Sequence, residues 1–251
     1  LHRNIGGVSM IDLYGMTSPS VQKVRIMLEE VELPYNFVFL NVHKGDLRKP
    51  EFVALNPNGK VPVIVDHDGL GGKKPYKVFE SGAILIYLAE KTGKLLPKDP
   101  ARRFNVIQWL IMYSSGMGPM YGQFVHFNHF TTEHIYSAKR YETEVGRISD
   151  VLEKRLSESA FIADDEFTIA DLSAFPWVRV LSREFGETHP LLKIGHPKRP
   201  NIARWFEAVS TRPRVARALR IIDEMKKTTQ TATADELDRY FGRGAYSRQL
   251  S

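Results

Sequence analysis

The pattern of apolar and polar positions changes near residue 95, which divides the chain into two regions. In the first region, β-branched and aromatic runs predict four short strands, at residues 10–14, 35–42, 61–66 and 76–80. Residues 21–31 and 81–93 instead place apolar side chains at the 3.6-residue spacing of a helix. Gly93 is well placed to end the second of these helices. The first region therefore reads as strand, helix, strand, a linking segment, strand, strand and helix.

That order is the order of a thioredoxin-like unit, so residues 10–94 are expected to form one. Its first two strands should be parallel and its last two antiparallel. A proline-bearing linker follows, and strand alternation stops after it. Helical periodicity then predicts four long helices, at about residues 101–128, 134–158, 168–183 and 199–225. The predicted fold class is an α/β thioredoxin-like N-terminal domain followed by an all-α domain over residues 95–225. The polar tail, residues 226–251, either stays loose or folds over a cleft.

The stretch FTIAD, residues 167–171, has the pattern of a helix start. Thr168 is the expected N-cap, and Asp171 lies at the third helical position, where it can reach back to the cap. Phe167 can pack on Leu172 as a hydrophobic staple. This motif is therefore assigned to folding rather than to chemistry.

Composition narrows the possible functions. Of 251 residues, 43% are hydrophobic and 25% are charged, which is typical of a soluble globular protein. No apolar run approaches the roughly 20 residues of a membrane-spanning helix, so no membrane partner is expected. Residues 1–9 lack a signal-peptide core and are left out of the fold as an extension. The net charge of +6 comes without a dense basic run, which argues against nucleic acid and leaves a small anionic ligand possible.

The chain contains no cysteine. This excludes a disulfide framework, a thiolate zinc site and a cysteine nucleophile. Any thiol chemistry must therefore use a thiol that arrives with the substrate. A cytoplasmic location is expected. His126 and His129 are three residues apart but have no third ligand at a sensible spacing, so no metal is expected. They are interpreted as pocket-wall or interhelical residues.

Two proline-containing turns carry candidate chemistry. In MTSPS, residues 16–20, Ser18 is a potential N-cap with Pro19 at the first helical position. In NPNGKVPVIVD, a cis bond between Val61 and Pro62 would turn the backbone of Val61 outward, where a peptide-like ligand could pair with it. The alternative is an ordinary trans proline at the start of a strand, and only about 5–6% of such bonds are cis.

A third turn, in FESGAILIYL, joins a strand to a helix. Ser81 can serve simply as an N-cap. A helix N-terminus also suits a carboxylate, and Glu80 beside it can receive an ammonium group. The pair therefore fits either a structural cap or the zwitterionic end of an amino acid.

Taken together, these motifs resemble the cytosolic glutathione transferases over nearly all of residues 10–222. Within that superfamily the chain is most similar to the bacterial Nu class and to the Ure2-like enzymes. The stretches that carry the resemblance are KPEFVALNPNGKVPVIVDH, FESGAILIYLAEKTG, IQWLIMYSSGMGPMYGQFVHFNHF and AKRYETEV.

The resemblance implies a glutathione site. Glu80 and Ser81 match the pair that binds the γ-glutamyl group, and Val61 matches the residue before the cis-proline, here Pro62, that pairs with the cysteinyl backbone. Lys60 and Arg140 match basic residues that approach the ligand, although a solvated surface charge explains either residue equally well.

The resemblance also implies a thiol-binding group. Relatives usually carry Thr-Pro-Asn where this chain has Ser18, Pro19 and Ser20. Ser18 is therefore the first candidate to hydrogen-bond the glutathione sulfur and Ser20 the second. Tyr14, at the end of the first strand, could match the catalytic tyrosine of other classes but could equally be a packing residue.

The electrophile is expected to lie against residues 109–130. One helix face cannot bury all the large apolar residues there, which include Met112, Tyr113, Met117, Met120, Tyr121 and Phe124. The others are predicted to line an apolar substrate pocket, although core packing is a competing interpretation for most of them.

The expected function is a glutathione-dependent enzyme with glutathione as cosubstrate. Nu-class resemblance favours disulfide-bond reduction; conjugation or lyase chemistry on a small aromatic electrophile or ether is the alternative. A non-catalytic binding module of the same fold is the rival from another class. The family usually forms dimers, so a homodimer is expected.

Overall fold

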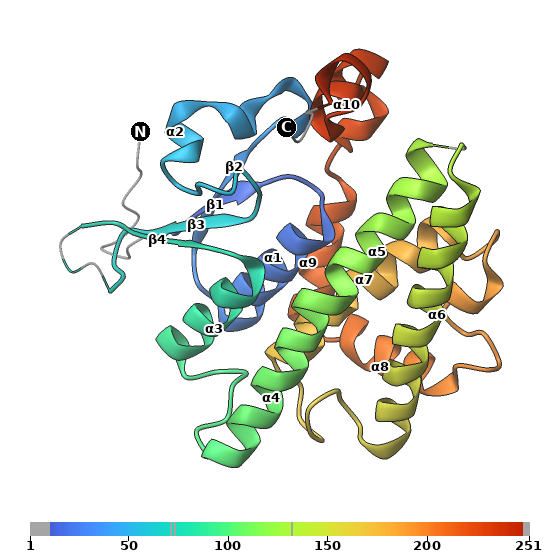
Figure 1. Ribbon diagram of the computed structural model, residues 1–251. Coiled ribbons are helices and arrows are strands. Elements are labelled where there is room, and N and C mark those ends of the chain that lie inside the picture. The colour runs from blue at the N-terminus through green and yellow to red at the C-terminus, as the bar shows by residue number, and fades with distance from the viewer. Residues whose placement is uncertain (1–10, 71, 73, 132, 248–251) are drawn as a thin grey trace. The chain divides into compact units, whose positions relative to one another are not determined.

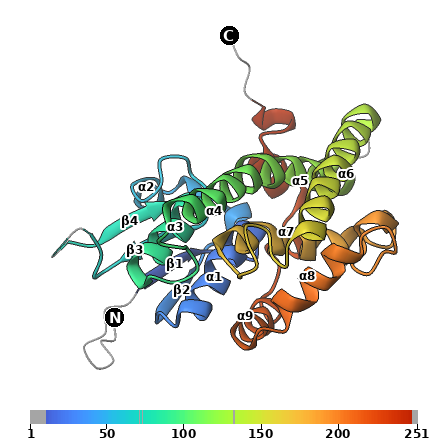
Figure 2. The ribbon, with the colours of Figure 1, turned by 90° about the horizontal axis from the view of Figure 1, so that it is seen from below.

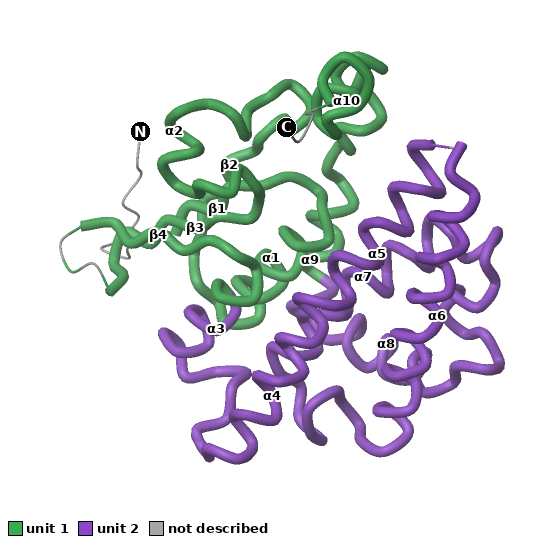
Figure 3. The backbone as a smooth tube through the Cα atoms, in the orientation of Figure 1, with its two compact units in different colours: residues 1–84, 217–251 green, residues 85–216 purple. Residues whose placement is uncertain are grey.

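The computed structural model describes residues 11–70, 72, 74–131 and 133–247. These residues form two compact units, one within residues 11–84 and 217–247 and the other within residues 85–216 (Figure 3). The division between the two units falls inside two helices, and the domain bounds at residues 94 and 225 stay predictions. Residues 1–9 and Met10, the first residue of the first predicted strand, lie outside the described residues.

The first unit contains a four-stranded sheet with the strand order β2-β1-β3-β4 (Figure 1). Its strands are β1 (Ile11–Gly15), β2 (Tyr35–Phe39), β3 (Val63–Asp66) and β4 (Tyr76–Phe79). As predicted, β1 and β2 are parallel and β3 and β4 are antiparallel. Strand β2 is shorter than expected because the chain turns into a 3-10 segment at Val42. Strand β3 starts only after Pro62.

Helices cover both faces of this sheet, with α1 and α2 on opposite sides (Figures 1 and 2). The unit contains α1 (Pro19–Val31), α2 (Pro50–Val53) and α10 (Ala234–Phe241), with short turns η1 (Val42–Lys44), η2 (Asp46–Arg48), η6 (Thr228–Gln230) and η7 (Gly244–Tyr246). Helices α3 (Ser81–Thr92) and α9 (Pro213–Asp223) each cross a unit boundary. The apolar positions predicted for α1, including Val24 and Leu28, are fully buried. Gly93 follows α3 in the left-handed conformation, which confirms the predicted helix stop.

The second unit is helical. It contains α4 (Pro100–Met112), the π segment η3 (Tyr113–Met117), α5 (Gly118–Val125), the π segment η4 (His126–Phe130), α6 (Ile135–Glu158), α7 (Ile169–Phe185), the 3-10 turn η5 (Pro190–Leu192) and α8 (Pro200–Ser210). None of the described helices of the protein is long and apolar enough to cross a membrane.

Two of the predicted helices differ from the observed ones. The helix predicted at 101–128 is helical throughout, but π segments interrupt it. The first of these precedes Pro119, which lacks the N–H that an α-helix would pair with the carbonyl of Ser115. The helix predicted at 199–225 is two helices, because α8 ends before Thr211 and Pro213 starts α9.

The FTIAD motif is a structural cap, as predicted. Thr168 and Asp171 form a reciprocal capping box at the start of α7. The buried Asp171 carboxylate also accepts hydrogen bonds from the backbone N–H of Ile162 and from Nε1 of Trp205, at 2.9 and 2.8 Å. This one carboxylate therefore ties α7, α8 and the preceding loop together.

Candidate active site

The pairing of three neighbouring strands brings the three candidate turns of the first unit to the same edge of the sheet, where these strands begin or end. Tyr14 in β1 pairs with Val63 in β3, and Val63 pairs with Phe79 in β4. The chain leaves β1 just after Tyr14, enters β3 just before Val63 and leaves β4 just after Phe79. The turns that carry Ser18, Pro62 and Glu80 therefore lie along one edge of the sheet.

The first turn leads into α1. Ser18 occupies the N-cap position with extended backbone angles, and Pro19 is the first helical residue. The carbonyl of Ser18 accepts hydrogen bonds from the N–H groups of Val21 and Gln22, both at 3.0 Å. The Ser18 hydroxyl, however, makes no capping hydrogen bond. The cap position is thus confirmed, while the half-buried hydroxyl stays available to a ligand.

The second turn is the loop before β3. The Val61–Pro62 peptide bond is cis, as the family resemblance implies. Asn56, which is buried, holds the loop in place: its Oδ1 accepts from the N–H of Asn58 at 2.9 Å, and its Nδ2 donates to the carbonyl of Lys60 at 2.7 Å. Among the described residues, none is hydrogen-bonded to the N–H or C=O of Val61. The backbone of Val61 can therefore pair with an extended ligand.

The third turn differs from its prediction in one respect. Helix α3 begins at Ser81, and the carbonyl of Glu80 accepts the hydrogen bond from the N–H of Ile84 at 2.9 Å. Glu80 rather than Ser81 is therefore the N-cap residue. Glu80 has a φ of 69°, a conformation uncommon for a residue other than glycine. Its exposed carboxylate lies 3.5 Å from Nδ2 of Asn58, while Ser81 is 8% exposed in the first turn of α3.

Gln22 and Lys23 of α1 lie buried near these turns, and the sequence pattern did not single them out. Gln22 is buried, and its Nε2 donates to the carbonyl of Thr17 at 2.9 Å, which fixes the turn before Ser18. Lys23 is 1% exposed, and burial lowers its pKa to about 8, while the negative charge of Glu80 opposes that shift. The sequence alone gives little sign of these roles, because a lysine and a glutamine in a helix are normally expected to face water.

Tyr14 is half-buried and packs against the cluster of buried side chains formed by Val42, Leu47, Phe52 and Val63. Burial raises the pKa of its phenol, and the charge of Asp12 adds to that shift. The packing contacts fit the packing interpretation, while the protonation state of the phenol fits either role.

In the second unit, most of the predicted pocket residues belong to the packed interior. Tyr113, Met117, Tyr121 and Phe124 are each no more than 1% exposed, because α6 and α7 pack against this segment. Core packing, the competing interpretation, fits these four residues. Met112 and Met120 are the partly exposed residues of the predicted set.

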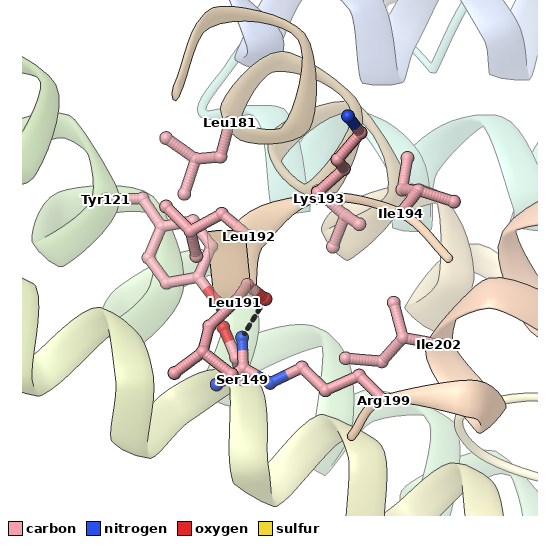
Figure 4. Close-up of a pocket in the computed structure, with 10 residues that line it drawn as sticks. Tyr121, Ser149, Leu181, Leu191, Leu192, Lys193, Ile194, Arg199 and Ile202 are labelled. Carbon is pink, nitrogen blue, oxygen red and sulfur yellow. Dashed lines mark hydrogen bonds between the residues drawn. The ribbon is translucent and has the colours of Figure 1, made fainter. Parts of the chain in front are cut away.

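Tyr121 does border a small cavity of about 20 Å³ in the second unit (Figure 4). Its hydroxyl and Oγ of Ser149 are hydrogen-bonded at 2.7 Å. The buried Arg199 guanidinium also lines the cavity, and it donates to the carbonyl of Leu191 and to the carboxylate of Asp150. A cavity of this size holds about one water molecule, so it is a packing defect rather than a substrate site.

The remaining predicted residues of the second unit lie on its surface. Arg140 is half exposed and forms an ion pair with Glu144 at 3.1 Å. His126 and His129 pack their rings against Phe130. No group of three potential ligands for a metal ion occurs among the described residues.

Comparison with known proteins identifies the family. The model of the glutathione S-transferase N-terminal domain matches residues 9–90, and that of the C-terminal domain matches residues 120–213. Disulfide-bond oxidoreductase YfcG of Escherichia coli is 40% identical over 211 residues, which cover 84% of this chain and 94% of that protein. The chain belongs to the glutathione S-transferase family.

Solved structures agree with this assignment. A glutathione transferase from Burkholderia graminis, with two glutathione molecules bound per subunit, is 42% identical with a TM-score of 0.78; the match covers 87% of this chain and 89% of that one. A glutathione transferase from Pseudomonas putida, with one glutathione disulfide bound per subunit, is 38% identical with a TM-score of 0.77. That match covers 84% of this chain and 91% of the other.

Proposed function

We propose that the protein is a glutathione-dependent disulfide reductase in which Ser18 holds the reacting thiolate. The observation that carries this proposal is the uncapped Ser18 hydroxyl at the N-terminus of α1, at the sheet edge shared with Val61 and Glu80, in a chain without cysteine. Both thiols of the reaction must then come from glutathione. The name of the E. coli relative, disulfide-bond oxidoreductase YfcG, and the two glutathione molecules in the B. graminis structure support this proposal.

The three turns divide the binding of glutathione between them. Glu80 receives the ammonium of the γ-glutamyl group, and Ser81 with the first turn of α3 receives its carboxylate. The N–H and C=O of Val61 pair with the cysteinyl backbone in the manner of an added strand. Lys60, next to Val61, adds a positive charge beside the anionic peptide. These contacts place the sulfur at the start of α1.

The chemical role of α1 is to stabilise a thiolate. A free thiol has a pKa near 8.5 and is mostly protonated at neutral pH, whereas the thiolate is the nucleophile. The Ser18 hydroxyl donates a charge-assisted hydrogen bond to the sulfur, and the dipole of α1 adds to the stabilisation. Ser20, at the second helical position, is the second candidate donor.

The reaction proceeds in two exchange steps. The bound thiolate attacks one sulfur of a disulfide substrate, forms a mixed disulfide and releases the other half as a thiolate, which takes up a proton. A second glutathione thiolate then attacks the glutathione sulfur of the mixed disulfide. The products are glutathione disulfide and two free thiols, so no thiol of the protein is consumed.

The test compares two reactions of the same protein. Retention on immobilised glutathione checks binding, and activity is then measured with 2-hydroxyethyl disulfide and with chlorodinitrobenzene. We expect retention and a clear preference for the disulfide. Conjugation alone would support the conjugating enzyme instead, and retention with both activities at background would leave only a binding module.

We also propose that the protein forms a homodimer. The second unit carries exposed apolar side chains that monomers usually bury, with Phe104 and Ile111 seven residues apart on one face of α4. Ile135 and Tyr136 at the start of α6 are 73% and 82% exposed. Light scattering on the eluted protein should give twice the chain mass, and Phe104→Glu with Ile111→Glu should halve it. A monomeric mass for the unchanged protein contradicts this proposal.

A further inference from the structure

Arg25, in the middle of α1, is a buried cation in an unusual environment. It is 7% exposed, and its guanidinium lies over the ring of Phe37, 4.2 Å from the ring centroid. Its Nε donates to the hydroxyl of Tyr35 at 3.0 Å, and a terminal nitrogen donates to Sδ of Met225 at 2.7 Å. Among the described residues, no carboxylate forms an ion pair with Arg25. Buried charges are normally paired, so this guanidinium lacks the usual partner.

The sulfur of Met225 is a weak acceptor for such a group. A thioether accepts hydrogen bonds poorly, whereas a guanidinium carries five N–H donors. The contacts with Tyr35 and Met225 use two of these donors, and no further described residue accepts from the others. The Tyr35 hydroxyl in turn donates to Oε1 of Glu29 at 3.0 Å, which links Arg25 to that carboxylate only indirectly. A strong acceptor in place of the sulfur would therefore supply what the guanidinium lacks.

Met225 lies where an oxidant can reach it. It follows α9 in a bend of the chain, and it is partly exposed. Met27, two residues after Arg25 in α1, is by contrast fully buried. Because oxidation of a methionine sulfur depends on its exposure, Met225 is the more reactive of these two methionines.

We propose that Met225 is a site of reversible oxidation and that its sulfoxide binds Arg25 more strongly than the thioether does. A sulfur lone pair attacks one oxygen of a hydroperoxide, and the O–O bond breaks. The sulfur gains that oxygen and loses two electrons, while the hydroperoxide is reduced to water or to an alcohol. The flexible methionine side chain lets the new oxygen turn toward the guanidinium, where it accepts a charge-assisted hydrogen bond.

The direction of the effect distinguishes this site from ordinary methionine oxidation. A sulfoxide in an apolar core destabilises a protein, because a polar group replaces an apolar one. At Met225 the oxygen meets a buried cation instead, so oxidation should stabilise the protein. The contact joins residues 200 positions apart, so the sulfoxide strengthens the link between α1 and the start of the C-terminal tail. This proposal does not depend on the proposed function.

The experiment uses the full chain and two variants of the same residue. Met225→Leu cannot be oxidised, and Met225→Gln places a carbonyl oxygen near the position of the sulfoxide oxygen. Met120→Leu, at a partly exposed methionine of the second unit, is the matched control. Each protein is treated with hydrogen peroxide, peptide mass spectrometry locates the sulfoxides, and thermal unfolding gives the melting temperature. Methionine sulfoxide reductases for both sulfoxide epimers then test reversibility.

Peroxide should oxidise Met225 before Met27. The change in melting temperature on treatment should be about 2–4 °C more positive in the unchanged protein and in the control than in Met225→Leu, and the reductases should reverse it. The proposal is wrong if Met225 stays unoxidised under conditions that oxidise Met120, or if this difference is absent or negative.

The glutamine variant tests the role of Arg25 without an oxidant. Untreated Met225→Gln should melt above untreated Met225→Leu by a similar amount, because its carbonyl oxygen accepts from the guanidinium. In an Arg25→Leu background the advantage of glutamine over leucine should disappear. A glutamine variant that melts at or below the leucine variant overturns the proposal, and so does an advantage that persists without Arg25.

Discussion

The sheet edge of the first unit and the interior of the second unit treat polar groups in opposite ways. At the sheet edge, the Ser18 hydroxyl and the Val61 backbone make no hydrogen bond with a described residue, and Glu80 is exposed. In the second unit, the Asp171 carboxylate receives donors from Ile162, Thr168 and Trp205. Both arrangements arise at helix starts, so the same local motif completes the fold in one place and leaves polar groups without a partner among the described residues in the other.

The starts of α1 and α7 differ in whether side chains of the protein itself hydrogen-bond to the free polar groups there. Asp171 completes the cap of α7, so nothing remains for a ligand. At α1 the capping side chain stays free, and a neighbouring strand end supplies further unfilled groups. Substitutions in the second-unit interior should therefore change stability, and those at the sheet edge should change ligand chemistry.

The largest effect is expected from Phe124→Ala in the second unit. Phe124 is fully buried and packs edge to face on Phe185 with ring centroids 5.0 Å apart. Its loss should lower the free energy of unfolding by about 3–5 kcal/mol, measured by urea denaturation. Leu70→Ala, at a position 79% exposed, is the control and should change it by less than about 1 kcal/mol. If Phe124→Ala leaves stability unchanged but raises the KM for the disulfide substrate, Phe124 lines a substrate pocket instead.

A stabilising effect of about 3 kcal/mol is expected from Lys23→Met. The pKa of Lys23 falls to about 8 in the folded protein from an ordinary 10.5, so folding carries the cost of burying its charge at pH 7. Between about pH 8 and 10.5 the unfolded chain binds more protons, so the stability of the unchanged protein should rise with pH in that window. Urea denaturation at pH 7 and pH 10 measures both effects. Equal stability of the two proteins at pH 7 would show that the charge costs nothing.

Lys23→Met should also strengthen glutathione binding, because the Glu80 carboxylate loses a nearby positive charge that competes with the ammonium of the ligand. Lys91→Met, in the last turn of α3, is a control of the same charge change. A variant that gains stability and binds glutathione with unchanged affinity would mean that Lys23 has no part in the site.

Local patterns predicted most of the sheet edge, and long-range packing limited the rest. The strands and the turns at Ser18, Pro62 and Glu80 depend on residues close in sequence, so the spacing of apolar and turn residues indicated them. The family resemblance, rather than the residues alone, indicated the cis bond. The tail contact of Arg48 with Arg239 joins residues 191 positions apart, and no local pattern encodes it. Nor does apolar density distinguish a pocket wall from a core, which is why the sequence left both interpretations open for Tyr113 and Met117.

Ser18→Ala sharpens the comparison at the sheet edge. Loss of one charge-assisted hydrogen bond should raise the pKa of the bound glutathione thiol by about one to two units, or about 1.4–2.7 kcal/mol. Thiolate absorbance against pH measures this pKa, and disulfide reduction at pH 7 should fall about 10- to 100-fold. Stability should hardly change, because the hydroxyl caps nothing. Ser20→Ala is the matched variant, and a larger loss there would make Ser20 the thiol donor.

The smallest expected effect is a pH dependence of stability that comes from His43, which packs against the C-terminal tail. Burial lowers the pKa of His43 from an ordinary 6.5, although the charge of Glu236 opposes the shift. Below about pH 6.5 the unfolded chain binds a proton that the folded protein resists, so stability should fall as pH decreases through that value. His43→Phe should remove this part of the pH dependence in thermal unfolding from pH 7.5 to 5. A slope that His43→Phe leaves unchanged would assign this part of the pH dependence to other groups.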